Sequence, residues 1–199
     1  MKRHLIIASL CLFATAAWAE KADSNKPTTI TAETADFDDV TQSHVLTGSV
    51  ELQRGTLVMR SERATVRETP DGWQIATLVG GNGKLATFRQ KRDGGADLWV
   101  EGRAERIEYD QRTEVAKLFS KANITQLDGK RVTDEVNGEY ISYDSRKEVF
   151  AVRNDASGEN KPGKGRVTLI LAPRKTQAAQ PAQPAPAAQP AQPAAQDKK

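Results

Sequence analysis

A six-residue pattern occurs four times in this chain of 199 residues, and it constrains the fold more than any other feature. Each copy has a small residue followed by Glu, any residue, Ala or Ile, any residue, and then Phe, Val or Tyr. The copies occupy 32–37, 61–66, 104–109 and 138–143, and the repeated Glu recurs after 29, 43 and 34 residues. Such intervals are typical of repeated supersecondary units.

The hydrophobic alternation changes phase at each copy. In the third copy, Val100 and Ala104 share one parity, whereas Ile107 and Tyr109 have the other. A strand cannot keep one face toward a core across such a slip unless it bulges or turns a corner there. Four regularly placed corners predict a sheet that folds over repeatedly, so that two layers face each other.

Strand and turn signals fill the rest of the central region, and no window of 11 or more residues shows a capped 3.6-residue period. A shift of 72 residues places 46–52 on 118–124, so both halves repeat one order of elements. The predicted fold is an all-β, antiparallel, slightly twisted β-jelly-roll of about 14–16 short strands, open at both ends. Expected strands include 45–52, 85–88, 98–100, 115–118, 124–127 and 166–171.

The two ends of the chain have compositions unlike the centre. A basic start, an apolar run and an Ala17-Trp18-Ala19 site predict a signal peptide over 1–19, cleaved after Ala19, and export. The alternative is an uncleaved anchor. Residues 20–27 form a short N-terminal segment, and 28–173 form one domain. The Ala/Gln/Pro-rich tail over 174–199 is predicted to be disordered, with a solubilising, partner-binding or peptidoglycan-spanning role.

Loss of the signal peptide changes the charge and the chemistry that the chain offers. It leaves 27 basic and 26 acidic residues, a net charge of about +1, which gives no basis for nucleic-acid binding. Cys11, the only cysteine, also leaves, and His44 is the only remaining histidine. These counts exclude disulfides, cysteine nucleophiles and the usual Cys/His metal sites. We expect no cofactor and no metal.

The repeated Glu invites a catalytic interpretation, but four evenly spread acids do not make one converging pair. We therefore expect each Glu to be structural, accepting hydrogen bonds from backbone N–H groups that a corner frees. Three copies continue into Asp, namely Asp38, Asp110 and Asp144, which we expect to initiate turns.

The residues that face inward are small or medium-sized and apolar. They form either an ordinary sandwich core or an apolar groove that holds a lipid; covering ten methylenes would contribute about 8 kcal/mol before ordering costs. The groove residues are predicted to be Ile30, Ala35, Phe37, Val50, Leu52, Val66, Phe88, Ile107, Tyr109, Ile124, Ile141, Tyr143 and Leu169.

Several segments together resemble the OstA-like family of periplasmic lipopolysaccharide-transport proteins, over about residues 27–173. The similar segments are 30–33, 46–50 (against T-G-N-V), 83–90 (against G-x-P-A-T-F-x-Q), 100–104, Tyr109 and 166–171. Two departures are Ser120, where the second T-G-N motif has Gly, and Leu85, where the family has Pro.

The resemblance implies a β-jelly-roll that carries the lipid A part of lipopolysaccharide and has no catalytic activity. It also implies head-to-tail stacking into a bridge from the inner to the outer membrane. An LptC-like inner-membrane protein and an LptD-like outer-membrane protein would then be the partners at the two ends.

The predicted edge strands agree with stacking, because an open jelly-roll leaves an unpaired strand at each end. Pairing the last strand of one copy with the first of another would propagate as a filament; the alternative is a weak edge contact. The stacking edges are predicted to be Thr28, Thr29 and Ile30 at one end and Val167, Thr168, Leu169, Ile170 and Leu171 at the other.

Two other classes of function stay open on the residues alone. One is a structural adaptor that stacks between envelope proteins and binds no lipid. The other is a carbohydrate-active enzyme on a jelly-roll scaffold. The domain argues against the enzyme, because it has only Trp73 and Trp99 as tryptophan platforms and no evident carboxylate pair.

Overall fold

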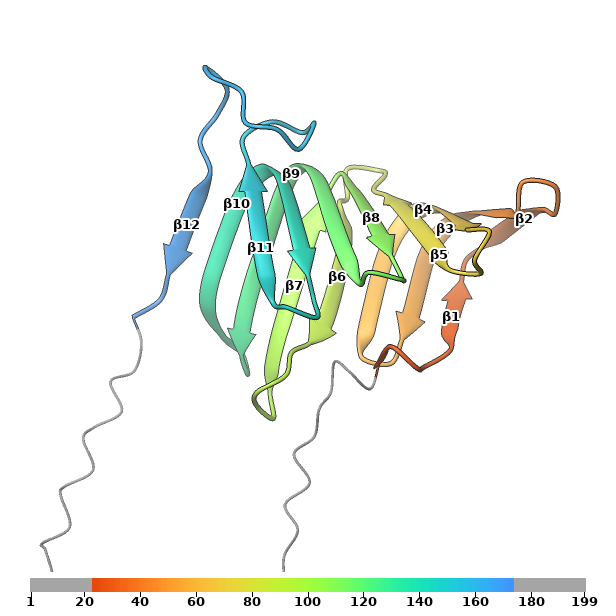
Figure 1. Ribbon diagram of the computed structural model, residues 1–199, viewed down its shortest axis with the longest axis horizontal. Helices are drawn as coiled ribbons and strands as arrows, with labels where there is room; N and C mark the ends of the chain where they lie inside the picture. The colour runs from red at the N-terminus through yellow and green to blue at the C-terminus, as the bar shows by residue number, and fades with distance from the viewer. Residues whose placement is uncertain (1–22, 174–199) are drawn as a thin grey trace, which may run out of the picture.

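A single antiparallel sheet of twelve strands folds back on itself in the computed structural model, which describes residues 23–173 (Figure 1). The predicted signal peptide, its cleavage site and the tail over 174–199 lie outside the described residues. No helix in the described part is long and apolar enough to cross a membrane. The strands are β1 (Thr28–Thr31), β2 (Thr34–Asp38), β3 (Ser43–Arg54), β4 (Leu57–Glu68), β5 (Gln74–Val79), β6 (Ala86–Lys91), β7 (Leu98–Ala104), β8 (Arg106–Asp110), β9 (Val115–Asp128), β10 (Arg131–Asp144), β11 (Val149–Arg153) and β12 (Thr168–Leu171).

The sheet forms two layers because β3, β4, β9 and β10 bend and contribute one half to each. The first halves of β3 and β9 and the second halves of β4 and β10 pair with β2, β5, β8 and β11, which we call the β2 layer. The other halves pair with β1, β6, β7 and β12, the β1 layer. The predicted all-β jelly-roll is thus confirmed. The strand count is twelve rather than 14–16 because these four strands run through their corners unbroken.

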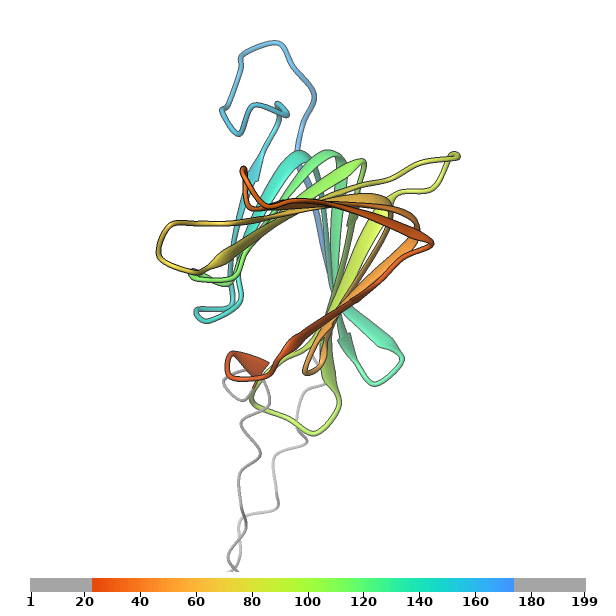
Figure 2. The same cartoon turned by 90° about the vertical axis from the view of Figure 1, so that its right-hand side faces the viewer.

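The corners line up to form one crease along the molecule. The backbone N–H of Glu33 donates to the Gly48 carbonyl at 3.0 Å, and that of Glu105 donates to the Ser120 carbonyl at 3.0 Å. Glu62 and Glu139 occupy the corresponding bends of β4 and β10. Viewed along the long axis, the layers join at the crease and diverge on the opposite side (Figure 2). The phase slip in the sequence therefore marks the places where the chain passes between layers.

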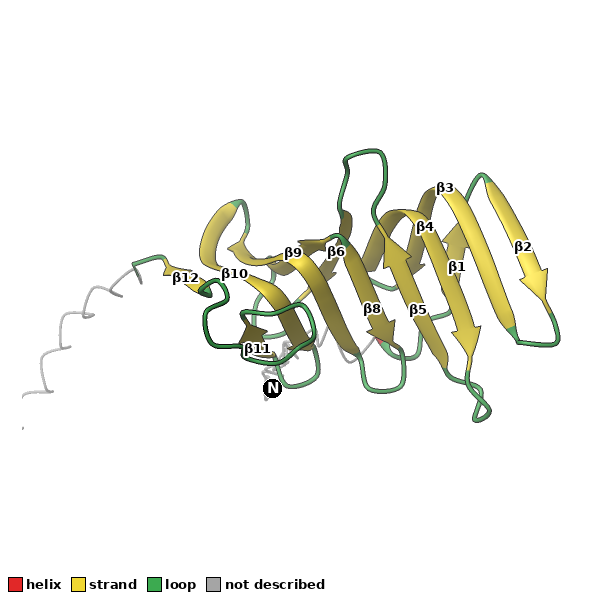
Figure 3. Ribbon diagram, turned by 90° about the horizontal axis from the view of Figure 1, so that it is seen from above, coloured by secondary structure: helices red, strands yellow, loops and turns green. Residues whose placement is uncertain are grey.

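A second kind of corner alternates with the Glu corners, and the sequence did not reveal it as a corner. In β3, Gly48 and Ser49 have φ of 82° and 47°; in β9, Ser120 and Lys121 have φ of 59° and 53°. Two successive left-handed residues turn the strand without changing which face points inward. The 72-residue shift had aligned these two pairs. The segments 115–118 and 124–127 are consequently one bent strand, β9, and not two strands (Figure 3).

The carboxylates of two of the four repeated Glu residues differ from our expectation in their partners. Glu33 accepts a hydrogen bond from Ser49 Oγ at 3.0 Å, and Glu105 pairs with Lys121 Nζ at 2.6 Å. Both partners are side chains rather than freed backbone N–H groups. The reason is that left-handed corners and Glu corners alternate along the crease. The second residue of each left-handed corner, Ser49 or Lys121, therefore has its side chain next to the neighbouring Glu.

The predicted turn role of the three Asp residues is confirmed. Asp38 Oδ1 accepts from the N–H groups of Val40 and Thr41, at 2.9 and 3.1 Å. Asp110 accepts in the same way from the second and third residues after it, and Asp144 from the third. Each turn ends four residues later in a left-handed residue, namely Gln42, Glu114 and Glu148. These turns carry the chain back at the side opposite the crease.

The chain crosses from the β2 layer to the β1 layer a last time through a loop at 154–167. Asn154 Oδ1 accepts from the Lys161 N–H at 2.9 Å, and Asp155 Oδ1 accepts from the Ser157 N–H and from Lys161 Nζ, both at 3.0 Å. The loop delivers β12, which begins at Thr168, so the expected strand over 166–171 starts two residues late.

Acid should loosen this loop. The hydrogen bonds from Ser157 hold the pKa of Asp155 well below its usual value of 3.8. Because this pKa is lowered in the folded protein, ionised Asp155 stabilises the loop fully at pH values above the ordinary pKa of an Asp carboxyl. This stabilisation decreases as the pH falls below that ordinary value. We expect faster intrinsic-rate-corrected hydrogen exchange over 154–167 at about pH 3 than at about pH 6. Asp155→Asn should remove this difference and Glu159→Gln should not; equal exchange at both pH values would contradict it.

Candidate functional site

The candidate site is the space between the layers, whose walls are built by rows of inward side chains. Strand pairing aligns these rows from one edge of each layer to the other. In the β2 layer the two rows are Ala35, Leu46, Ala64, Leu78, Ile107, Leu118, Ile141 and Val152, and Phe37, His44, Val66, Ala76, Tyr109, Ala116, Tyr143 and Phe150. In the β1 layer a row comprises Ile30, Leu52, Met59, Phe88, Gly102, Ile124, Val136 and Leu169.

The structure brings the predicted groove residues together on these walls, with burial that depends on their place in the row. Nine are buried, namely Val50, Leu52, Val66, Phe88, Ile107, Tyr109, Ile124, Ile141 and Tyr143. Ile30 is half-buried and Ala35 is exposed. Phe37 is 70% exposed and Leu169 is 59% exposed. The exposed members lie on edge strands, which have no neighbour on one side, so the apolar wall emerges at both ends of the molecule.

The middle of the interior is filled by side chains. The rings of Phe88 and Tyr143 stack across the two layers with centroids 6.2 Å apart, and Phe150 stacks on Tyr143 at 4.8 Å. Gly102 makes room for the Phe88 ring, because a Cβ at that position would lie within 2.9 Å of three ring carbons. A cavity beside Tyr109 and Ala76 has a volume of only about 10 Å³.

Several wall residues were not predicted from the sequence, among them Met59, Leu78 and Leu118, all fully buried. The signal that would have found them is the pairing register. Leu78 and Leu118 flank the predicted Ile107 directly in neighbouring strands, and Met59 pairs with the predicted Leu52.

Buried and half-buried polar groups gather between the inner faces of the two layers on the side opposite the crease, and we call this line the polar seam. It comprises Arg54, Gln90, Arg92 and Gln126 from the β1 layer and Tyr109 Oη, Gln111, Glu114, Ser145 and Glu148 from the β2 layer and its turns. The interior is therefore apolar near the crease and polar at the seam.

Two contacts join the layers across the polar seam. Arg54 Nη1 donates a long hydrogen bond of 3.5 Å to Tyr109 Oη. Arg92 pairs with Glu148 Oε2 at 2.6 Å and donates to Gln126 Oε1 at 3.0 Å. Burial raises the pKa of Tyr109 to about 12, an effect that the neighbouring Arg54 partly opposes. Tyr109 is thus a neutral phenol at any physiological pH.

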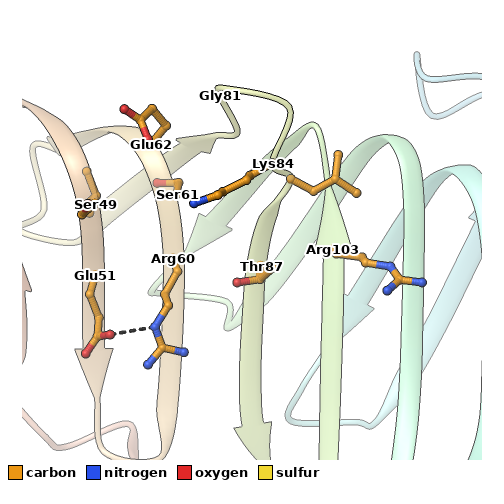
Figure 4. Close-up of a pocket in the computed structure, with 11 residues that line it drawn as sticks. Ser49, Glu51, Arg60, Ser61, Glu62, Gly81, Lys84, Thr87 and Arg103 are labelled. Atoms are coloured by element: carbon orange, nitrogen blue, oxygen red, sulfur yellow. Dashed lines mark hydrogen bonds and ion pairs between the residues drawn. The ribbon is translucent and has the colours of Figure 1, made fainter.

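A separate depression of about 710 Å³ lies on the outer face of the β1 layer, beside the crease (Figure 4). It forms where β4 leaves β6 to pair with β5, which opens the sheet next to Ser61. Charged groups of both signs line it, including the pair of Arg60 and Glu51 at 2.7 Å, and Lys84 points toward Ser61. Val50 is the one predicted groove residue among its lining residues.

Comparison with known proteins decides the family. The model described as "LptA/(LptD N-terminal domain) LPS transport protein" matches residues 29–149, more than half of the chain. The chain belongs to this family of LPS transport proteins. The match begins at β1 and ends at the start of β11, so the whole crease, the polar seam and both walls except their members on β11 and β12 lie within the matched region.

Relatives of the LptA family align over most of their length. The lipopolysaccharide export system protein LptA of Haemophilus influenzae is 28% identical over 176 residues, which cover 88% of this chain and 94% of the relative. The LptA of Escherichia coli K12 is 29% identical over 175 residues, 87% and 86% of the two chains. The crystal structure of LptH, the LptA-homologous periplasmic component of the lipopolysaccharide transport device of Pseudomonas aeruginosa, superposes with a TM-score of 0.65 at 21% identity, covering 76% of this chain and 99% of LptH. This last likeness shows the shared fold.

Proposed function

We propose that this protein is a periplasmic, non-enzymatic lipopolysaccharide carrier that holds lipid A acyl chains between its two layers. Copies would stack head to tail into a bridge from the inner to the outer membrane. An LptC-like protein would bind one end of the bridge and an LptD-like protein the other. The family membership and the names of the relatives support transport of lipopolysaccharide.

One structural observation carries the proposal, namely the continuous apolar rows that reach from one edge strand to the other. One β2-layer row runs from the exposed Phe37 to Phe150, and the β1-layer row runs from Ile30 to the exposed Leu169. When the edge strands of two copies pair, these ends would meet and join the walls of both copies. An acyl chain could then pass from one copy to the next without leaving an apolar surface, at a gain of about 0.8 kcal/mol for each methylene kept from water.

The filled interior favours a second candidate, a stacking adaptor that binds no lipid. Ile107, Leu118 and Ile141 are all fully buried, and the cavity beside Tyr109 has a volume of only about 10 Å³. Acyl chains could enter the middle of the interior only if the two layers separated at the polar seam. The crease on the opposite side would then act as the hinge. Lipid capture distinguishes the carrier from the adaptor.

A photo-crosslinking residue in place of Phe37 should capture lipopolysaccharide in cells. Phe37 pairs with His44 on the inward face of the β2 layer and is exposed, so the substitution should not disturb the core. Its neighbour Asp36 lies on the outward face of the same strand and provides the matched control. Immunoblotting for lipopolysaccharide-protein adducts gives the readout.

Capture at position 37 without capture at position 36 supports the carrier. Equal capture at both, or capture at 36 alone, contradicts an inward-facing lipid site. If native mass spectrometry shows oligomers that retain no glycolipid, the adaptor is the better description.

A further inference from the structure

Two arginines of the polar seam, the buried Arg54 and the half-buried Arg92, stand out because each has a buried nitrogen without a partner. Arg54 is 3% exposed, and the Arg92 side chain is 16% exposed. The Nε atoms of both are buried and have no hydrogen-bond acceptor. A buried guanidinium that is incompletely paired is destabilising, since desolvation of the charge is not fully offset. Such groups suit an anion that supplies the missing acceptors.

The acceptors that hold Arg54 are neutral. Its Nη2 donates to the Ser24 carbonyl and its Nη1 to Tyr109 Oη, and no carboxylate of the described residues forms an ion pair with it. Ser24 belongs to the segment 23–27 before β1, which we call the strap. Asp23 anchors the strap to the β3–β4 turn by accepting a hydrogen bond from Thr56 Oγ1. The strap therefore covers the guanidinium without neutralising its charge.

Arg92 is held across the opening of the two layers. Its Nη2 contacts Glu148 Oε2, whereas Glu148 Oε1 is buried and has no partner. Neither member of this pair is fully satisfied. The pair closes the seam, and an incoming anion could replace the carboxylate while Glu148 moves out to water.

The two guanidinium groups lie on one face at a spacing that a single polar head could span. Arg54 continues the inward parity of Leu52, and Arg92 continues that of Phe88 and Gln90. β4 lies between β3, which carries Arg54, and β6, which Arg92 follows. The two Cα atoms are therefore separated by two strand spacings sideways and by two residues along the strand, a distance of about 12 Å. The apolar rows begin directly beside these two arginines. If the acyl chains of a lipid lay in the apolar interior near the crease, its polar head group would lie at the polar seam.

We propose that Arg54 and Arg92 are the recognition groups for the phosphate groups of a glycolipid head whose acyl chains occupy the interior. The inference rests on the proposed carrier function and names the part of the ligand that the seam binds. A guanidinium presents parallel N–H groups that match two phosphate oxygens, and such charge-assisted pairs are strong when they are shielded from water. The phosphates take the places of the Ser24 carbonyl and of the Glu148 carboxylate. The strap and the seam pair then open together with ligand entry.

The test compares the purified protein's affinity for bisphosphorylated lipid A with that for the same lipid after removal of both phosphates. We expect the wild-type protein to prefer the phosphorylated lipid at least tenfold. Arg54→Met and Arg92→Met should each lower affinity for the phosphorylated lipid by about tenfold or more and leave affinity for the dephosphorylated lipid unchanged. Arg54→Lys should lie between, because it retains the charge and loses the planar fork.

Arg89→Met is the matched control, because Arg89 loses the same charge from the outward face of the same layer, where it pairs with Glu101 at 2.9 Å. Circular dichroism and thermal melting check that each variant folds, and Arg54→Gln replaces Arg54→Met if the latter does not. Equal wild-type affinities for the two lipids, or equal losses in Arg89→Met, would overturn the inference. Binding of inorganic phosphate alone with the same Arg54 dependence would overturn the assignment to a lipid head. If the wild-type protein binds neither lipid, it is the proposed carrier function that fails.

Discussion

Gly102→Ala should lower the free energy of unfolding by about 2–3 kcal/mol and the melting temperature by roughly 5–10 °C. The new Cβ would lie within 2.9 Å of three carbons of the Phe88 ring. Phe88 is only 3% exposed and its ring stacks on Tyr143, so a shift of the ring would disturb the packing between the layers. The added methyl group therefore forces either a strained side chain or a shift of β7 away from β6.

Thermal or chemical denaturation measures the effect, and a second substitution identifies its cause. Phe88→Leu removes the ring that clashes, so the double variant should be more stable than the sum of the two single changes predicts. Gly165→Ala is the control, because a Cβ there meets no atom within 4 Å. A melting temperature for Gly102→Ala close to that of the Gly165 variant would refute the packing account.

Leu171→Pro should weaken head-to-tail self-association at least about tenfold and leave the monomer folded. The Ala172 N–H donates to the Thr133 carbonyl at 2.8 Å, so by alternation the Leu171 N–H points away from β10, toward the free edge of β12. Among the described residues this edge has no neighbouring strand. Proline removes the outward donor and places its ring where the strand of another copy would pair.

Sedimentation velocity over a concentration series measures the association. Leu171→Ala removes the same side chain but keeps the N–H, and it should associate more tightly than Leu171→Pro. Ala172→Pro removes the bond to Thr133, so it should detach β12 within the monomer and expose the edge of β10. Association of Leu171→Pro equal to that of Leu171→Ala would rule out strand pairing through β12.

The fold class could be predicted from the sequence because the strands and turns of a jelly-roll depend on residues that are close together in the chain. The phase slip beside Glu62 marked a corner, since face alternation is a local property of a strand. Asp38, Asp110 and Asp144 marked turns because their side chains bond backbone N–H groups two or three residues away. The left-handed corner at Ser120 escaped notice because no local rule requires positive φ at serine.

The sequence by itself determined an all-β chain with regular corners, its inward rows and its resemblance to a lipopolysaccharide-transport family. Only the tertiary structure decided that Phe88, Tyr143 and Phe150 stack to fill the middle of the interior. It alone also placed Arg54 beside Tyr109 and Arg92 beside Glu148, residues 55 and 56 positions apart in the chain. The physical reason is that periodicity states which face a side chain takes, whereas its partner across two layers is set by how the whole sheet folds over.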